Sequence, residues 1–202
     1  VISTGLINAH LFCMHPTVTG SGDEYVMPAK SMAKLAYHLL KEHPEVLETS
    51  KIEKKIFREG TDDEIEMENW NFMLPGLVYK YAGVDGLKTG TTNLAGYCFT
   101  GTAKRDGTRL IAVVMKAVDS QGVGSYKARF DATAKLFDYG FGQFTNQELV
   151  PANYVVEDQK TIPVTKGKED SVGIATKDDL SFMVKSSDKD DYTTKLILDV
   201  EE

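Results

Sequence analysis

The sequence predicts an α/β (α+β) fold, with an antiparallel sheet and helices followed by a small all-β domain. Residues 83–115 contain three strand-like runs, the last two joined by the turn signal Arg105-Asp106-Gly107. Two other segments, 29–41 and 125–141, carry apolar residues at helical spacing. After residue 143 the chain changes to short β-branched runs divided by charged turns. We therefore assign residues 1–143 to the first domain and residues 144–202 to the β-rich one.

The first part of the chain is expected to form one helix between less regular segments. Residues 1–22 lack sustained periodicity and are expected to be irregular. Pro28 opens the helix over residues 29–41, and Pro44 ends it. Residues 51–59 are a weak strand candidate, and the acidic run 62–68 is expected to be a solvated loop rather than a metal site. The apolar stripe of the helix comprises Met32, Leu35, Ala36, Leu39 and Leu40.

The second part of the chain is expected to hold the sheet, a long helix and the β-rich domain. Ser125 is positioned to cap the helix that ends near Phe141, with Gly140 and Gly142 as terminators. The buried stripe of that helix includes Tyr126 and Phe130. The expected strands of the sheet are 83–89, 96–103 and 109–115, and those of the β-rich domain are 148–156, 160–164, 171–175, 180–184 and 192–200.

Composition narrows the functional classes. The 202 residues are 42% hydrophobic, carry a net charge of -7 and have a pI near 5.2, which argues against a nucleic-acid partner. No apolar run approaches the length of a membrane span. Cys13 and Cys98 are expected to be buried thiols. No metal is expected, because the two cysteines and His10, His15, His38 and His43 do not form a metal-spaced set.

The segment with the most chemical information is 84–92. Lys88 offers a positive charge, Thr89 a hydrogen bond, and Gly90 a position where a ligand backbone can lie flat against a strand. These are the parts of a site for a carboxylate or an acyl group. A nucleotide-binding phosphate loop is excluded, because Leu87 stands where that motif needs glycine and a strand follows instead of a helix.

Four segments together resemble the low-molecular-weight penicillin-binding proteins, and specifically the serine-type D-alanyl-D-alanine carboxypeptidases of Gram-positive bacteria. These segments are 57–63, 69–71, 83–90 and 95–103. The resemblance implies a transpeptidase/β-lactamase-like first domain that acts without a cofactor. It implies hydrolysis of peptidoglycan stem peptides ending in D-Ala-D-Ala through an acyl-enzyme, and acylation by β-lactams. It also implies an extracytoplasmic protein, held at the membrane by a segment absent from this chain.

The resemblance also assigns roles to individual residues of the Lys-Thr-Gly motif. Lys88 is expected to bind and polarise the substrate, and Thr89 to meet its terminal carboxylate. The backbone N–H of Thr91 is expected to supply half of the oxyanion hole. Lys88, Thr89 and Thr91 are therefore the predicted catalytic residues, and the same three residues with Gly90 form the predicted substrate-binding set.

The nucleophile motif Ser-x-x-Lys of this family has no convincing match. Ser31 and Lys34 have the spacing, but Lys34 is expected on the solvated face of its helix. Ser186-Ser187-Asp188-Lys189 lies in a charged turn, and Ser21-Gly22-Asp23 only loosely resembles the family's second motif. We therefore expect a C-terminal fragment whose nucleophile lies upstream of Val1 and which is inactive alone.

Two further expectations follow from a fragment of this kind. The strand 109–115 would keep an open edge and the Phe130 helix an uncovered apolar face, so self-association is expected. The alternative function is a non-catalytic cell-wall-binding or interaction module that kept the strand edge and lost the chemistry. A β-lactamase is less favoured, because the β-rich domain fits the carboxypeptidases better.

Overall fold

The computed structural model describes residues 2–3, 9–10, 26–93, 95–192, 195 and 197. The predictions for Cys13, His15 and Ser21-Gly22-Asp23, and most of the strand expected at 192–200, lie outside these residues. The chain divides into two compact units, Val1–Gly142 and Gln143–Glu202, which are described separately. Within the described residues, no helix combines the length and apolar character needed to cross a membrane.

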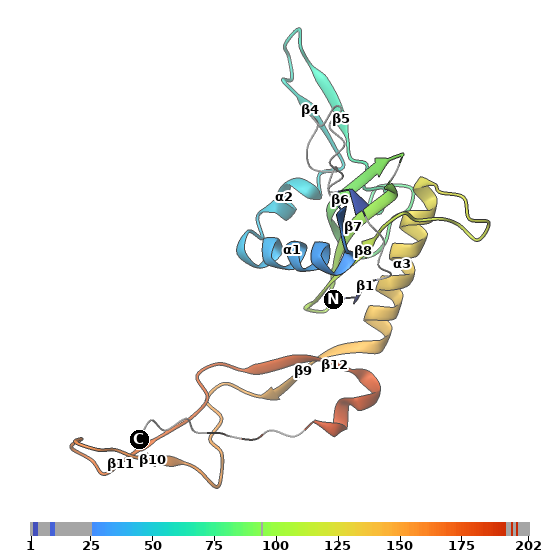
Figure 1. Ribbon diagram of the computed structural model, residues 1–202. Coiled ribbons are helices and arrows are strands. Elements are labelled where there is room, and N and C mark those ends of the chain that lie inside the picture. Colours follow the sequence, from blue (N-terminus) through green and yellow to red (C-terminus); the bar gives the residue numbers. More distant parts are fainter. Residues whose placement is uncertain are drawn as a thin grey trace. The chain divides into compact units, whose positions relative to one another are not determined.

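The first unit is built on a four-stranded sheet with the order β1-β8-β7-β6 (Figure 1). The strands β6 (Val84–Thr92), β7 (Gly96–Arg105) and β8 (Thr108–Val114) form the predicted antiparallel meander. Asp106 and Gly107 have φ values of 46° and 79°. Both values fit the two-residue turn that joins twisted antiparallel strands, so the turn prediction is confirmed.

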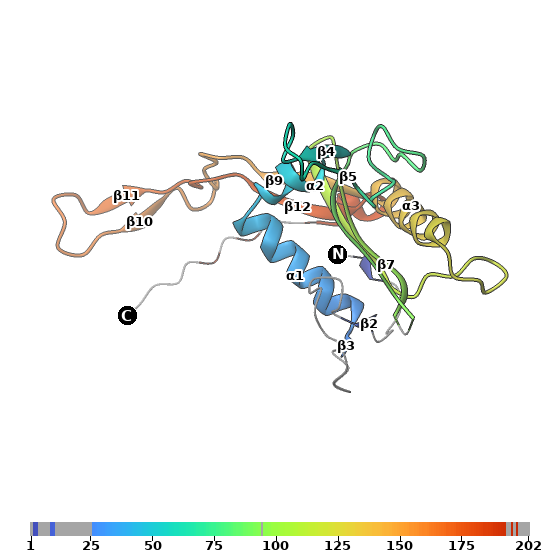
Figure 2. The ribbon, with the colours of Figure 1, turned by 90° about the horizontal axis from the view of Figure 1, so that it is seen from above.

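Two helices cover opposite faces of this sheet (Figure 2). Helix α1 (Ala29–Glu42) packs on Ile111 and Val113 of β8, whereas helix α3 (Tyr126–Gln143) packs on Leu110 and Ala112 of the same strand. Successive side chains of a strand point to opposite faces, so this alternation buries both sides of β8. The site strand β6 therefore belongs to a well-supported sheet.

Both helices were predicted, but the sequence analysis misassigned details of each. The buried face of α1 is made of Ala29, Ala33 and Ala36, and Leu35 is 46% exposed. Small side chains let the helix approach the sheet closely, so Leu35 is turned outward, whereas Ala36 is buried and Met32 and Leu40 pack against the core as expected. The predicted cap of α3 is confirmed, because Ser125 Oγ accepts the Ala128 N–H at 3.1 Å.

The glycine terminators predicted for α3 are wrong. Gly140 and Gly142 lie inside the helix, which runs to Gln143, and neither has the positive φ that a left-handed helix end requires. Packing of Phe137, which is 1% exposed, holds this end of the helix in place. Tertiary packing thus outweighs the local preference of glycine.

The connection between α1 and β6 differs from its prediction in two ways. Helix α2 (Val46–Ser50) was not expected. The weak strand candidate is β4 (Lys54–Phe57), and the acidic run supplies its antiparallel partner β5 (Ile65–Glu68) rather than a loop throughout. Lys54 forms ion pairs with Glu66 and Glu68, so these carboxylates face a lysine across the hairpin.

Two features that were expected to drive self-association differ from their prediction in the described part of the chain, and self-association itself stays a prediction. The strand β1 (Ile2–Ser3) pairs in parallel with β8, so the edge expected to be open carries a partner at Ala112 and Val113. A second short strand, β2 (Ala9–His10), pairs with β3 (Val26–Met27), so the entry segment is not wholly irregular. Phe130 is 1% exposed, and its helix face is covered by aromatic neighbours.

The second unit contains two antiparallel strand pairs. The strand β9 (Phe144–Val150) pairs with β12 (Leu180–Lys185), and β10 (Thr161–Pro163) pairs with β11 (Ser171–Gly173). A 3-10 helix, η2 (Ser186–Asp191), follows. The all-β character is confirmed, although β9 begins at Phe144 rather than at residue 148 and ends earlier than predicted.

Candidate functional site

The strand β6 ends the sheet, with β7 on one side only in the described part of the chain. Its side chains alternate between the two faces, so Thr89 and Thr91 share one face and Lys88 and Gly90 the other. Thr89 is 8% exposed, whereas Lys88 and Thr91 are exposed. The motif therefore lies at an open edge, with Thr89 directed inward.

The hydrogen-bond pattern gives the direction of the Thr91 backbone. Thr91 lies opposite Tyr97 of β7, and the Tyr97 carbonyl accepts the Ala117 N–H at 2.9 Å on the far side of that strand. Thr91 and Tyr97 are thus a non-hydrogen-bonded pair, and the N–H of Thr91 points away from β7. Lys88 Nζ donates to the Thr89 carbonyl at 2.7 Å, which agrees with backbone groups that face the free edge.

Contacts at the start of β6 fix the strand. Asp85 forms a bidentate ion pair with Arg109 of β8, with both oxygen–nitrogen distances 2.8 Å. Ser50 Oγ donates to the Asp85 carbonyl at 2.9 Å, and Asn71 Nδ2 donates to the Gly86 carbonyl at 3.3 Å. The ion pair and these hydrogen bonds fix the position of β6 at the residues that directly precede Lys88.

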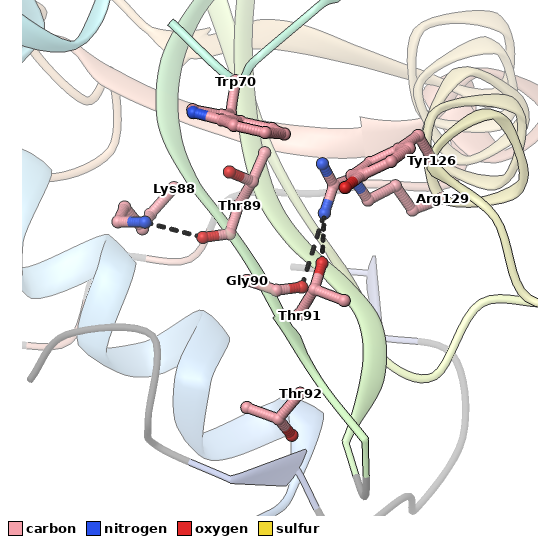
Figure 3. A pocket seen from close by; sticks show the side chains of 8 residues that line it. All are labelled: Trp70, Lys88, Thr89, Gly90, Thr91, Thr92, Tyr126 and Arg129. Carbon is pink, nitrogen blue, oxygen red and sulfur yellow. Dashed lines mark hydrogen bonds between the residues drawn. The ribbon is translucent and has the colours of Figure 1, made fainter. Parts of the chain in front are cut away.

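The four residues predicted as substrate-binding line one pocket of about 350 Å³ (Figure 3). The pocket is formed by β6, by the segment before it and by the first turns of α3. Its lining residues are Trp70, Lys88, Thr89, Gly90, Thr91, Thr92, Tyr126 and Arg129. The structure therefore brings Lys88, Thr89, Gly90 and Thr91 together, and adds residues that the sequence analysis did not assign to the site.

Arg129 is the polar residue that the sequence analysis missed. It is 1% exposed, and its Nη1 donates to Thr91 Oγ1 at 3.2 Å and to the carbonyls of Gly90 and Cys98 at 3.4 Å. Its guanidinium also lies 5.1 Å from the ring centroid of Tyr126. The available signal was its place on the buried face of α3, where a charged residue is uncommon.

The pocket is electropositive although the whole chain is acidic. Lys88 and Arg129 supply two positive charges, and no aspartate or glutamate is among the residues that line it. The hydroxyls of Thr89 and Thr91 add hydrogen-bond donors beside these charges (Figure 3). Such an arrangement suits an anionic group such as a carboxylate, because charge-assisted hydrogen bonds are the stronger kind.

The serine candidates named from the sequence lie outside this pocket. Ser31 and Lys34 are exposed on α1, as expected for a solvated helix face. Ser187 Oγ donates to Asp188 Oδ1 in η2. Cys98 is a buried thiol, as predicted: its Sγ donates to the Ala95 carbonyl at 3.4 Å, and burial raises the pKa of the thiol. No serine of the described residues lines the pocket.

Comparison with known proteins defines the family. The family model described as D-alanyl-D-alanine carboxypeptidase matches residues 3–119, more than half of the chain, and the chain belongs to this family. A second model, described as the C-terminal domain of penicillin-binding protein 5, matches residues 144–201. The predicted family is thereby confirmed.

Individual relatives come from several bacteria. The D-alanyl-D-alanine carboxypeptidase DacF of Bacillus subtilis (strain 168) is 32% identical over 171 residues, which are 84% of this chain and 40% of the relative. The carboxypeptidase DacA of Escherichia coli (strain K12) is 28% identical over 203 residues, 100% of this chain and 45% of the relative. The chain thus spans less than half the length of these relatives. Restriction to Gram-positive bacteria stays a prediction.

Solved structures give the same fold. A peptidoglycan synthesis regulatory factor from Streptococcus pneumoniae has a TM-score of 0.67 and 34% identity, covering 83% of this chain and 45% of that one. Penicillin-binding protein D2 from Listeria monocytogenes, in its ampicillin-bound form, has a TM-score of 0.50 and 37% identity, covering 61% of this chain and 45% of that one. The transpeptidase-like fold expected from the sequence is therefore confirmed.

Proposed function

We propose that the protein is a serine-type D-Ala-D-Ala carboxypeptidase of peptidoglycan maturation, and that the free edge of β6 is its substrate-binding wall. The observation that carries this proposal is the pocket in which Lys88, Thr89, Gly90 and Thr91 meet the buried cation of Arg129. Family membership supports the reaction class, and the pocket supports the placement of the substrate.

Each residue has a part in binding or in stabilising charge. The carboxylate of the terminal D-Ala is placed near the hydroxyl of Thr89, between the positive charges of Lys88 and Arg129. Gly90 has no side chain to keep the peptide backbone away from the strand. The N–H of Thr91 points to the open edge, where it can stabilise the oxyanion that develops during acyl transfer.

The nucleophilic serine is assigned to a part of the protein outside the described residues. Its hydroxyl attacks the carbonyl between the two D-Ala residues, the terminal D-Ala leaves, and water then hydrolyses the acyl-enzyme. β-Lactams would acylate the same serine, a proposal supported by the ampicillin-bound form of the Listeria relative. Peptidoglycan lies outside the cytoplasmic membrane, so we place the action of the protein there.

The two-domain division is part of the proposal. We assign residues 1–143 to a portion of the catalytic domain and residues 144–202 to a β-rich domain. The two compact units of the chain and the second family match, at residues 144–201, support this division. All residues proposed for the site belong to the first unit.

The proposal is tested on the protein as its gene encodes it, by acylation with labelled penicillin and by release of D-Ala. Lys88→Ala should slow acylation about 10²-fold, because a preorganised charge is lost from the site. Lys104→Ala is the matched control, since Lys104 is an exposed lysine of β7 outside the pocket. Equal acylation rates for the two variants would contradict the placement of the site at Lys88. A gene-length protein that is never acylated would favour the non-catalytic module.

A further inference from the structure

Two aromatic side chains of the pocket have no part in the chemistry described above. Trp70 precedes β6 and is 58% exposed, and Tyr126 begins α3 and is 40% exposed. Their ring centroids lie 5.9 Å apart, with an interplanar angle of 39°. Both line the pocket, so together they form one continuous aromatic surface at its rim (Figure 3).

The exposure of Trp70 is not the result of a loosely held loop. Its neighbour Asn69 donates from Nδ2 to the carbonyls of Ser50 at 3.0 Å and Ile52 at 2.9 Å. Its other neighbour, Asn71, is 1% exposed and hydrogen-bonded to Gly86. The segment is therefore fixed on both sides of the ring. Two large rings held open to solvent beside a site leave apolar surface that a ligand can bury.

The arrangement of the rings and the carboxylate donors indicates which part of a ligand meets them. The side chain of Thr89 lies beneath the Trp70 ring, and Arg129 lies beside Tyr126 (Figure 3). A carboxylate bound by these donors places its α-carbon next to the aromatic surface. A cationic substituent there is disfavoured by Lys88 and Arg129, since no acidic residue lines the pocket. An apolar substituent fits the surface.

We propose that Trp70 and Tyr126 form an aromatic wall that selects the C-terminal residue of the ligand by the apolar side chain on its α-carbon. This inference rests on the proposed function, because it takes the carboxylate to lie at Thr89 and Arg129. Such a wall favours alanine over glycine at the terminal position. Because the wall is open to solvent, it also accepts a larger apolar side chain.

The test is a titration of the 202-residue chain with acetyl-D-Ala-Gly, acetyl-D-Ala-D-Ala and acetyl-D-Ala-D-Leu. The Kd is read from the amide signal of Gly90 in proton–nitrogen correlation spectra. The wild-type chain should bind the D-Ala ligand about threefold and the D-Leu ligand about tenfold more tightly than the Gly ligand, as partial burial of the added carbons predicts. The indole N–H signal should give the same ranking of the three Kd values. This signal belongs to Trp70, because Trp70 is the sole tryptophan of the chain.

Matched variants separate the wall from the rest of the site. Trp70→Ala should bring the three Kd values within about a factor of two, and Trp70→Phe should restore most of the order. Tyr37→Ala is the control, because Tyr37 is an aromatic residue of α1 that is 48% exposed and outside the pocket. The Tyr37→Ala variant should keep the wild-type ranking of the three Kd values.

Two results would overturn the wall, and they differ in what they say about the proposed function. If Trp70→Ala keeps the wild-type order while Lys88→Ala weakens all three ligands, the wall is wrong and the carboxylate site stands. If Lys88→Ala leaves all three affinities unchanged, the carboxylate site is wrong and the wall fails with it.

Discussion

Replacing Asn71 with alanine should destabilise the first unit strongly. Asn71 is 1% exposed, its Oδ1 accepts the Met73 N–H at 3.2 Å, and its Nδ2 donates to the Gly86 carbonyl at 3.3 Å. Alanine leaves that N–H and that carbonyl buried without these partners, and each such loss costs about 1–3 kcal/mol. We therefore expect Asn71→Ala to lower the free energy of unfolding by about 2–4 kcal/mol.

The assay is urea unfolding followed by the fluorescence of Trp70, which reports on the first unit because the chain has one tryptophan. The urea concentration at the midpoint of unfolding should fall. The slope of the free energy of unfolding against urea should stay constant, since the substitution changes little of the surface that unfolding exposes. Asn93→Ala is the control, because Asn93 is exposed and should change the free energy by about 0.5 kcal/mol or less. A loss below about 1 kcal/mol for Asn71→Ala, or an equal loss in the control, would refute the reasoning.

Three further outcomes are expected. Thr89→Val should weaken binding of acetyl-D-Ala-D-Ala about tenfold by removing one hydrogen bond to a carboxylate, and an unchanged Kd would contradict that role. Native Cys98 should react with iodoacetamide at pH 8 about 10²-fold more slowly than the urea-unfolded chain, because burial raises its pKa; equal rates would show an accessible thiol. Desolvation and the hydrogen bond to Asp138 raise the pKa of Tyr81 from 10.0 to about 12, so its neutral form is favoured in the folded state. Stability should therefore fall between about pH 10 and pH 12, and the fall should be smaller in Tyr81→Phe; identical pH profiles would contradict this.

The meander and both long helices were predictable because their signals are local. The turn at Asp106 and Gly107 and the cap at Ser125 are set by the residues at those positions. Errors arose where packing decides the outcome. Leu35 has the character of a core residue, but the close contact of three alanines with the sheet turns it outward. The pairing of β1 with β8 joins distant parts of the chain and leaves no local signal.

The candidate site was partly predictable for the same reason. The residues from Lys88 to Thr91 are consecutive, so a motif could identify them. Arg129 and Trp70 reach the pocket only because α3 and the segment before β6 fold next to the same strand. A single sequence shows that Arg129 lies among apolar residues of a helix, but not that its guanidinium meets Thr91.

The most direct test of the central claim compares acetyl-D-Ala-D-Ala with its C-terminal carboxamide on the 202-residue chain. The two ligands differ only at the C-terminal group, where the carboxamide lacks the negative charge and carries an NH2 donor in place of one acceptor oxygen. We predict that the carboxylate shifts the amide signals of residues 88–91 and that the carboxamide binds at least about tenfold more weakly, since a charged hydrogen bond is lost. Equal affinities, or shifts confined to residues away from β6, would contradict the assignment of β6 as the strand that binds the substrate.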